Sequence, residues 1–251
     1  MYGNIEIILP LDVNLALTSS FLKRIFRFSD MITTAIFDFL TKLKENNNRE
    51  WFQQHKKDYE NVRKEYESFI GEMIPEISLL DPAIGNPALK DCLFRIYRDV
   101  RFSNDKSPYK THFGAFVGKG GRKTNGVGYY IHIEPGQSMI AGGVYQPQPD
   151  ILKLIRNEVY FNSAEFRQIL STPKFVEFFG TLDDFDKMKL PPKDFPADFP
   201  DIDLLKYRSY IVFKTLPDKD ILKPDFRKDV LEIFTAMLPF HGFLHRAINN
   251  G

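Results

Sequence analysis

The order of two hydrophobic periodicities along the chain restricts its fold more than any other sequence feature. Apolar residues recur every three or four positions before residue 80 and again after residue 149, as they do along one face of a helix. Between these regions, at 92–144, and once more at 207–214, apolar and polar residues alternate with the period of a strand. The strands are thus gathered together, so we expect an α+β fold: an antiparallel sheet of about five strands, packed with helices from both the N- and C-terminal thirds.

The alternating regions predict individual strands and their connections. The glycine-rich residues 118–128 predict a hairpin loop, because they join two strands and lack the GxxxxGK[ST] spacing of a phosphate-binding loop. Gly142 and Gly143 fall inside a predicted strand, which indicates a bulge or a close backbone approach. Access for a ligand or a neighbouring chain at this point is a further hypothesis. The expected strands are residues 92–99, 111–117, 127–134, 138–144 and 207–214.

Residue types that favour helix ends mark where the helices begin. Thr33 or Thr34 is expected to cap a first helix, and Asn47 with Glu50 forms a capping-box pattern before a long second one. Residues 183–203 are acidic and contain four prolines. Three phenylalanines in this stretch can hold it against the surface, so we expect an ordered loop rather than a flexible linker.

The first 30 residues fit poorly with the rest of the chain, because the regular helical pattern begins only at Met31. We expect residues 1–30 to be either a disordered arm or an artefact of the assigned start site. An alternative is a short membrane-surface helix at residues 21–28. Residues 31–251 are expected to form a single α+β domain.

Composition and charge exclude several classes of protein. The net charge of +1 argues against a bulk electrostatic partner, and no apolar run approaches the roughly 18 residues that a membrane span needs. The single cysteine, Cys92, excludes an internal disulfide framework and a cysteine-based zinc site, and it favours a reducing compartment. We therefore expect a cytoplasmic protein with no membrane partner. Cys92 is a weak candidate for a nucleophile, because its neighbours are apolar.

Positive charge is concentrated in one segment of the chain. Residues 95–123 contain eight Lys and Arg against two Asp, a net charge of +6, so that the rest of the chain sums to −5. The first half of this segment interleaves Arg with Tyr. Arg binds carboxylate and phosphate groups bidentately, and Tyr hydroxyls orient the same oxygens. The side chains expected to bind an anionic ligand are Arg95, Tyr97, Arg98, Arg101, Lys106, Tyr109 and Lys110.

Strand alternation also directs two histidines and a carboxylate toward this segment. Within the predicted strand 127–134, His132 and Glu134 lie on one face, and His112 begins the preceding strand. A shift of register by one residue would separate them. These three residues are the candidates for proton transfer in catalysis. The alternative is a two-histidine, one-carboxylate site for iron or zinc, although we expect no bound metal.

Two long segments resemble a known protein family. Residues 94–112 (FRIYRDVRFSNDKSPYKTH) and 128–147 (GYYIHIEPGQSMIAGGVYQP) are similar to the signature pair of a widespread family of bacterial and fungal proteins, domain of unknown function family 2461. The pattern FL at 39–40 followed by NREWF at 48–52 is also similar. The resemblance covers nearly everything from Met31 onward. It implies a self-contained cytoplasmic domain and supplies no catalytic residues.

These observations favour a cytoplasmic protein that binds a small anionic or phosphorylated ligand on the polar face of the sheet, and they leave open whether it is an enzyme. One alternative is that the arginines form salt bridges with Asp91, Asp99 and Asp105 that hold the sheet to its helices. Another is a non-enzymatic interaction module whose basic and aromatic surface docks nucleic acid or a partner protein. Nucleic acid is not favoured, because the chain is close to neutral and carries no known recognition motif. Neither a cofactor nor the oligomeric state can be inferred from the sequence.

Overall fold

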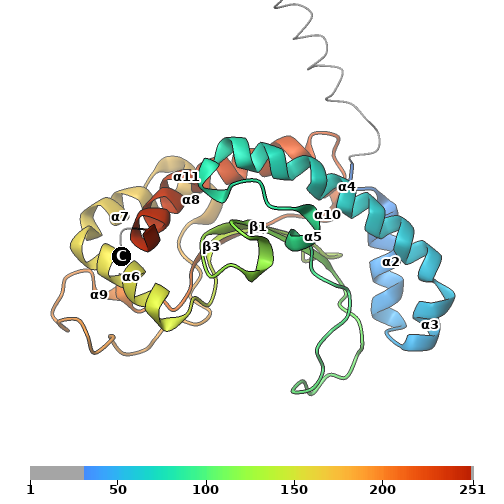
Figure 1. The fold of residues 1–251 in the computed structure, drawn as a ribbon, viewed down its shortest axis with the longest axis horizontal. Coiled ribbons are helices and arrows are strands. Elements are labelled where there is room, and N and C mark those ends of the chain that lie inside the picture. Colours follow the sequence, from blue (N-terminus) through green and yellow to red (C-terminus); the bar gives the residue numbers. More distant parts are fainter. Residues whose placement is uncertain (1–30, 250–251) are drawn as a thin grey trace, which may run out of the picture.

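The computed structural model describes residues 31–249 (Figure 1). The disordered arm or start-site artefact expected at residues 1–30, and the membrane-surface helix at 21–28, therefore lie outside the described residues. Within residues 31–249, no helix is both long enough and apolar enough to cross a membrane.

Helices occupy both ends of this region and a four-stranded sheet lies between them, which confirms the α+β class. The longest helices are α4 and α11, and both contain a proline. The helices are α2 (Thr34–Glu45), α3 (Arg49–Gln54), α4 (Lys56–Leu80), α5 (Leu89–Cys92), α6 (Pro149–Phe161), α7 (Ser163–Leu170), α8 (Pro173–Phe179), α9 (Ile202–Leu205), α10 (Asp218–Ile221) and α11 (Phe226–Asn249), with short 3-10 turns η2 (Pro82–Ile84) and η3 (Gly121–Lys123).

The sheet contains β1 (Phe113–Gly118), β2 (Gly128–Ile133), β3 (Met139–Val144) and β4 (Tyr210–Thr215) in that order, and every neighbouring pair is antiparallel. These strands match four of the five that alternation predicts. The connection between β1 and β2 contains only η3, as expected for a hairpin loop. The connection between β3 and β4 is long and contains α6 to α9, so β4 reaches the sheet from a distant part of the chain.

The fifth predicted strand, at 92–99, is wrong. Helix α5 includes Cys92, and the residues after it make only isolated bridges, Leu93 with Ala115 and Tyr97 with Tyr109. The Phe94 amide first bonds the Gly114 carbonyl at the edge of β1. From residue 96 onward the chain pairs instead with residues 108–110, the returning limb of a long loop. We call this projection, residues 97–109, the arm; it extends away from the sheet in Figure 1. The alternation of polar and apolar residues in 92–99 therefore arises from two successive partners, β1 and the returning limb, and not from one continuous strand.

One face of the sheet carries the helical layer. Tyr129 and Ile131 of β2 are fully buried there, and the Tyr66 hydroxyl of α4 donates a 2.9 Å hydrogen bond to the Ile131 carbonyl. Phe234 of α11 packs against Tyr129 with ring centroids 4.5 Å apart. Figure 1 shows α4 and α11 on the same side of the sheet. Burial of each such side chain stabilises the fold by about 1.5–3 kcal/mol. The residues that alternate with them point to the opposite face, which we call the open face.

Of the two helix caps that the sequence predicts, one is confirmed and the other is wrong. Thr33 caps α2, since its hydroxyl accepts a 3.3 Å hydrogen bond from the Ala35 amide. The capping box of Asn47 and Glu50 is wrong, because Asn48 caps α3 by accepting from the Trp51 amide at 2.9 Å. Asn47 is drawn into a tertiary contact instead. Its side chain donates to the backbone carbonyl of Tyr109 at 2.9 Å and accepts from the same residue's amide at 3.1 Å.

Of the stretch 183–203, residues 183–201 form an ordered loop, as expected, and the last two residues begin α9. The rings of Phe195 and Phe199 lie 5.4 and 4.7 Å from that of Tyr160 in α6. Phe185 stacks on Tyr145, which comes directly after β3, with centroids 5.7 Å apart. This last contact brings the start of the loop to the rim of the open face.

Candidate functional site

A cavity of about 540 Å³ lies on the open face of the sheet. Residues of all four strands form its floor, the residues just before and after the arm form one wall, and the 183–185 region forms the other wall. The lining is largely aromatic, with a polar end at His112, Tyr130 and His132. The principal apolar lining residues are Phe94, Phe116, Met139, Tyr145, Phe185 and Phe213.

Glycines in the strands let the aromatic rings lie close to the floor of the cavity. A Cβ atom on Gly128 would lie 2.3 Å from Cζ of Phe116, and one on Gly114 would lie 2.7 Å from the hydroxyl oxygen of Tyr130. No side chain fits at such distances without a shift of its neighbour. The predicted close approach at Gly143 also exists: a Cβ there would lie 2.1 Å from the Tyr210 carbonyl oxygen of the adjacent strand, and Gly143 itself borders the cavity.

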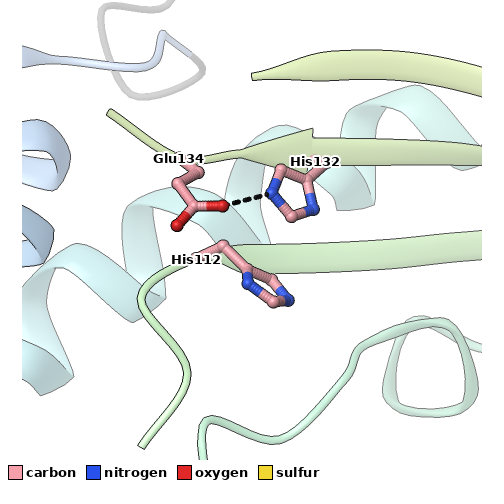
Figure 2. A group of neighbouring side chains, drawn as sticks. All are labelled: His112, His132 and Glu134. Carbon is pink, nitrogen blue, oxygen red and sulfur yellow. Dashed lines mark hydrogen bonds and ion pairs between the residues drawn. The ribbon is translucent and has the colours of Figure 1, made fainter. Parts of the chain in front are cut away.

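The register of β1 and β2 assembles the polar end. Phe113 pairs with Ile133 and Gly114 with His132, so His112 lies just beyond one end of the ladder and Glu134 just beyond the other strand's end. His132 and Glu134 are two residues apart and therefore share a face. Figure 2 shows the two histidines and the carboxylate converging from these positions. Nε2 of His132 lies 3.0 Å from Oε2 of Glu134, and the rings of His112 and His132 are 4.2 Å apart.

Further hydrogen bonds hold these side chains in place. The Tyr130 hydroxyl lies 3.0 Å from Nδ1 of His132, and the Thr111 hydroxyl donates to Oε1 of Glu134 at 2.7 Å. The buried Ser138 hydroxyl bonds both the amide and the carbonyl of Glu134, at 3.0 and 2.9 Å, and so fixes the turn after β2. Thr111, Tyr130 and Ser138 were not among the predicted site residues. Of these three, only Tyr130 could have been predicted from the sequence, because it lies two residues before His132 in a strand and therefore on the same face.

Burial shapes the charge of this cluster. It lowers the pKa of His112 to about 4, with the neighbouring His132 acting in the same direction. Burial also lowers the pKa of His132, although the hydrogen bond with Glu134 opposes this effect. For Glu134, burial alone would raise the pKa, but the hydrogen bonds from Thr111 and His132 outweigh it and lower the pKa. At neutral pH the cluster therefore holds two uncharged imidazoles and one carboxylate, which suits it to accept a proton or to bind a cation.

The charged residues of the arm do not reach this cluster. Arg98 pairs with Asp105 and also donates to Oγ of Ser103 at 3.3 Å. The guanidinium of Arg101 donates two hydrogen bonds to the Asp99 carboxylate, at 2.9 and 2.7 Å. Lys106 donates to the Val100 carbonyl at 3.0 Å. The arm therefore neutralises its arginines within itself, as the salt-bridge alternative anticipates for Asp99 and Asp105, although these pairs stabilise the arm and do not join the sheet to a helix.

The two tyrosines predicted to orient a ligand lie at the base of the arm. Tyr109 is buried and stacks on Phe52 of α3 with centroids 3.9 Å apart. Its ring is therefore engaged in packing. Tyr97 is 52% exposed and lies 5.5 Å from the Tyr109 ring, outside the lining of the open-face cavity.

Two predicted ligand-binding residues, Arg95 and Lys110, do lie beside the cavity. Nζ of Lys110 is 5.0 Å from the ring centroid of Phe94, which lines the cavity wall. Burial lowers the pKa of Lys110, and the positive charges of Arg95 and Arg122 lower it further. Arg122 donates to the carbonyls of Lys90 and Asp91, at 2.8 and 3.0 Å. These three cations also line a second pocket, of about 850 Å³, and Phe94 belongs to the lining of both pockets.

Comparison with protein families places this arrangement in context. A family model described as "Conserved hypothetical protein (DUF2461)" matches residues 35–243. The chain belongs to the DUF2461 family. The match includes the sheet, the arm and the whole cavity lining, so the site is part of the DUF2461 domain itself. No curated protein and no solved structure matches the chain significantly.

The single cysteine of this DUF2461 domain lies apart from the site. Cys92 is fully buried at the end of α5. Burial and the neighbouring Asp91 raise the pKa of its thiol to about 11. A nucleophilic role is therefore disfavoured at neutral pH, because the thiol stays protonated.

Proposed function

We propose that this DUF2461 protein is a cytoplasmic protein that binds a small organic anion in the cavity on the open face of its sheet. One observation carries the proposal: an aromatic cavity and a group of cations meet at a single residue, Phe94, whose ring borders both. The apolar part of the ligand lies in the cavity, and its carboxylate or phosphate group is held by Lys110.

The shape of the cavity favours a ligand with a flat apolar part. Phe116 packs directly over Gly128, and Phe94 meets Tyr130 edge-on with centroids 6.0 Å apart. Aromatic walls of this kind bury planar groups by stacking and by exclusion of water. The volume lies within the range of ordinary small-molecule sites.

The charge beside the cavity favours an anionic group on that ligand. Among the described residues, neither Lys110 nor Arg95 forms an ion pair with a carboxylate. The charge of Lys110 also acts on the cavity's polar end, since it contributes to the lowered pKa of both His112 and His132. A bound anion would offset the mutual repulsion of Lys110, Arg95 and Arg122, and it would gain charge-assisted hydrogen bonds.

The polar end supplies groups for chemistry on a bound molecule. His132 lies at the cavity surface, with Glu134 behind one ring nitrogen and Tyr130 at the other. The Tyr130 hydroxyl lines the cavity and can pass its proton to Nδ1 of His132 as it takes one from a ligand, and Glu134 then stabilises the positive charge of the imidazolium. If the protein is an enzyme, we propose proton transfer by His132 as its step, with Glu134 as the positioning residue.

Binding of benzoate, phenyl phosphate and inorganic phosphate, measured by titration calorimetry, tests the proposal. The wild type is expected to bind at least one aromatic anion, and benzyl alcohol, which lacks the charge, is expected to bind more weakly. Lys110→Met should weaken anion binding about tenfold or more, because a charged hydrogen bond contributes about 1.5–3 kcal/mol. Lys106→Met is the matched control, because it removes the same charge from the arm; it should change nothing.

A second variant tests the place of the apolar group. Ala141 lies on the floor of the cavity, and Ala141→Phe should fill it and abolish binding of the aromatic anions. Equal effects of Lys110→Met and Lys106→Met, or unchanged binding in Ala141→Phe, would contradict the proposal. The interaction module would then be favoured if an Arg101→Ala, Phe102→Ala variant lost a partner, since Phe102 at the arm is 95% exposed.

A further inference from the structure

The three side chains at the polar end also form a donor set for a metal ion. His112, His132 and Glu134 each offer one ligand atom, and these atoms all lie within 4.8 Å of one another. Two imidazole nitrogens and one carboxylate oxygen make a set in which all three ligands suit transition metals such as Fe²⁺ and Zn²⁺. Among the described residues no other group of His, Cys, Asp and Glu meets this criterion.

The distances between the donors agree with a common ion. Two donors bound to one ion at about 2.1 Å each lie roughly 3 Å apart, and Nε2 of His132 is 3.0 Å from Oε2 of Glu134. The most distant donors must approach by about one to two ångströms. His112 lies just outside β1, where the ladder does not hold its backbone, so a small rotation of its side chain can supply this movement.

The surrounding hydrogen bonds leave the required atoms facing one another. Thr111 occupies Oε1 of Glu134, so Oε2 is turned toward His132. Tyr130 occupies Nδ1 of His132 and leaves Nε2 as the ligand atom. Metal-binding histidines usually bond a second group through the nitrogen that does not ligate. Gly114, opposite His132 in the register, adds no side chain that would cover the cluster.

We propose that His112, His132 and Glu134 bind a divalent transition-metal ion of the Fe²⁺ or Zn²⁺ type. Three protein ligands leave coordination positions free, and both histidines line the cavity. The free positions thus face the place where a small ligand binds. Ca²⁺ and Mg²⁺ are disfavoured, because they prefer oxygen ligands throughout. The metal site does not depend on the proposed anion, since its donors all belong to the chain.

Titration of the purified, metal-stripped chain with Co²⁺, Zn²⁺ and Fe²⁺ alone tests the site. We expect one ion per chain, and a visible absorption band when Co²⁺ binds. His112→Gln and Glu134→Gln should each weaken binding by about 100-fold or more, and Thr111→Val by about 10- to 100-fold, since it removes only the supporting hydrogen bond. His55→Gln is the control, because His55 lies far along the chain and stacks on Trp51.

Circular dichroism identifies any variant that fails to fold, and Thr111→Val gives an independent measure if a ligand variant does. The proposal is overturned if the wild type binds no stoichiometric ion, or if Glu134→Gln and Thr111→Val bind as tightly as His55→Gln. Lys110→Met should retain the ion. Loss of metal binding therefore leaves the anion proposal standing, and loss of anion binding in Lys110→Met leaves the metal site standing.

Discussion

At the scale of single residues, small side chains decide the shape of the site as much as the reactive ones do. On the β1 side the histidine and glutamate cluster faces the cavity without a covering side chain, because the residue opposite His132 is Gly114, and on the β3 side the small Ala141 lies opposite Tyr130. Gly128 has the closest contact with a ring among these positions, since any Cβ there overlaps the ring of Phe116. The lack of a side chain at these glycines thus determines how closely the aromatic rings approach the sheet and so shapes the cavity.

Gly128→Ala should destabilise the protein by about 1–3 kcal/mol, because the added methyl group forces Phe116 to move and also approaches the Val117 carbonyl oxygen at 2.9 Å. Urea denaturation measures this change. Gly242→Ala is the matched control, since a Cβ at this position in α11 meets no atom within 4 Å. It should be neutral or stabilising by up to about 1 kcal/mol. Equal stability of the two variants would contradict this account.

At the scale of elements, the arm depends on a contact that no local pattern indicates. Asn47, between α2 and α3, bonds both backbone groups of Tyr109, whose ring stacks on Phe52. These contacts join the helical end of the molecule to the returning limb of the arm. They also set where the chain enters β1, and so where His112 lies.

Asn47→Ala should therefore loosen the arm. Loss of two hydrogen bonds to partly buried backbone groups should cost about 1–3 kcal/mol. Hydrogen exchange at the Tyr109 amide should accelerate, and proteolysis within residues 97–109 should become faster. Asn46→Ala, which removes only a local 2.9 Å bond to the Lys42 carbonyl, is the control. Unchanged exchange at Tyr109 in Asn47→Ala would show that packing alone holds the arm.

At the scale of the whole molecule, a buried polar group joins the sheet to both long helices. Asp81, at the end of α4, accepts a 3.0 Å hydrogen bond from the Tyr129 hydroxyl of β2 and lies 3.4 Å from Nε2 of His245 in α11. Burial alone would raise the pKa of Asp81, but His241, His245 and Tyr129 together hold it well below its usual range. Burial lowers the pKa of His241, which is fully enclosed.

These shifts predict that stability falls in two stages on acidification. A histidine with a lowered folded pKa stabilises the protein above its ordinary pKa of about 6.5, and this contribution is lost as pH falls below that value. Asp81 acts in the same direction below about pH 4. The free energy of unfolding, measured between about pH 2 and 8, should fall below about pH 6.5 by at most about 1.4 kcal/mol per pH unit for each such histidine, and should fall further below about pH 4.

His241→Leu should reduce that slope, whatever its effect on absolute stability. Phe240→Leu, which changes a buried ring beside His241 that does not titrate, is the control and should leave the slope unchanged. A slope identical in wild type and His241→Leu would show that His241 does not titrate with folding. Asp81→Asn should make the second stage smaller, because the amide no longer titrates, while carboxyl groups such as Glu134, whose pKa is also lowered, keep their own contribution.

Much of the fold was readable from local pattern, and so was the central part of the site. Alternation in 127–134 predicted β2 and placed Tyr130, His132 and Glu134 on one face, because side-chain direction in a strand depends only on the parity of position. The same rule failed at 92–99, where the chain changes partner midway. Likewise Asn47 has the residue type of a cap, yet a distant backbone competes for its side chain.

The sequence by itself determined the class of fold, the four strands of the sheet and the parity that brings His132 and Glu134 to one face, because these depend on interactions between near neighbours. Only the tertiary structure decided that the arm neutralises its own arginines, and that Phe185 and Phe213 close a cavity with Phe94 and Phe116. Those cavity contacts join segments separated by a hundred residues or so in the chain. These features are stabilised by burial and charge pairing in the assembled fold, and the local periodicity of the sequence cannot predict either effect.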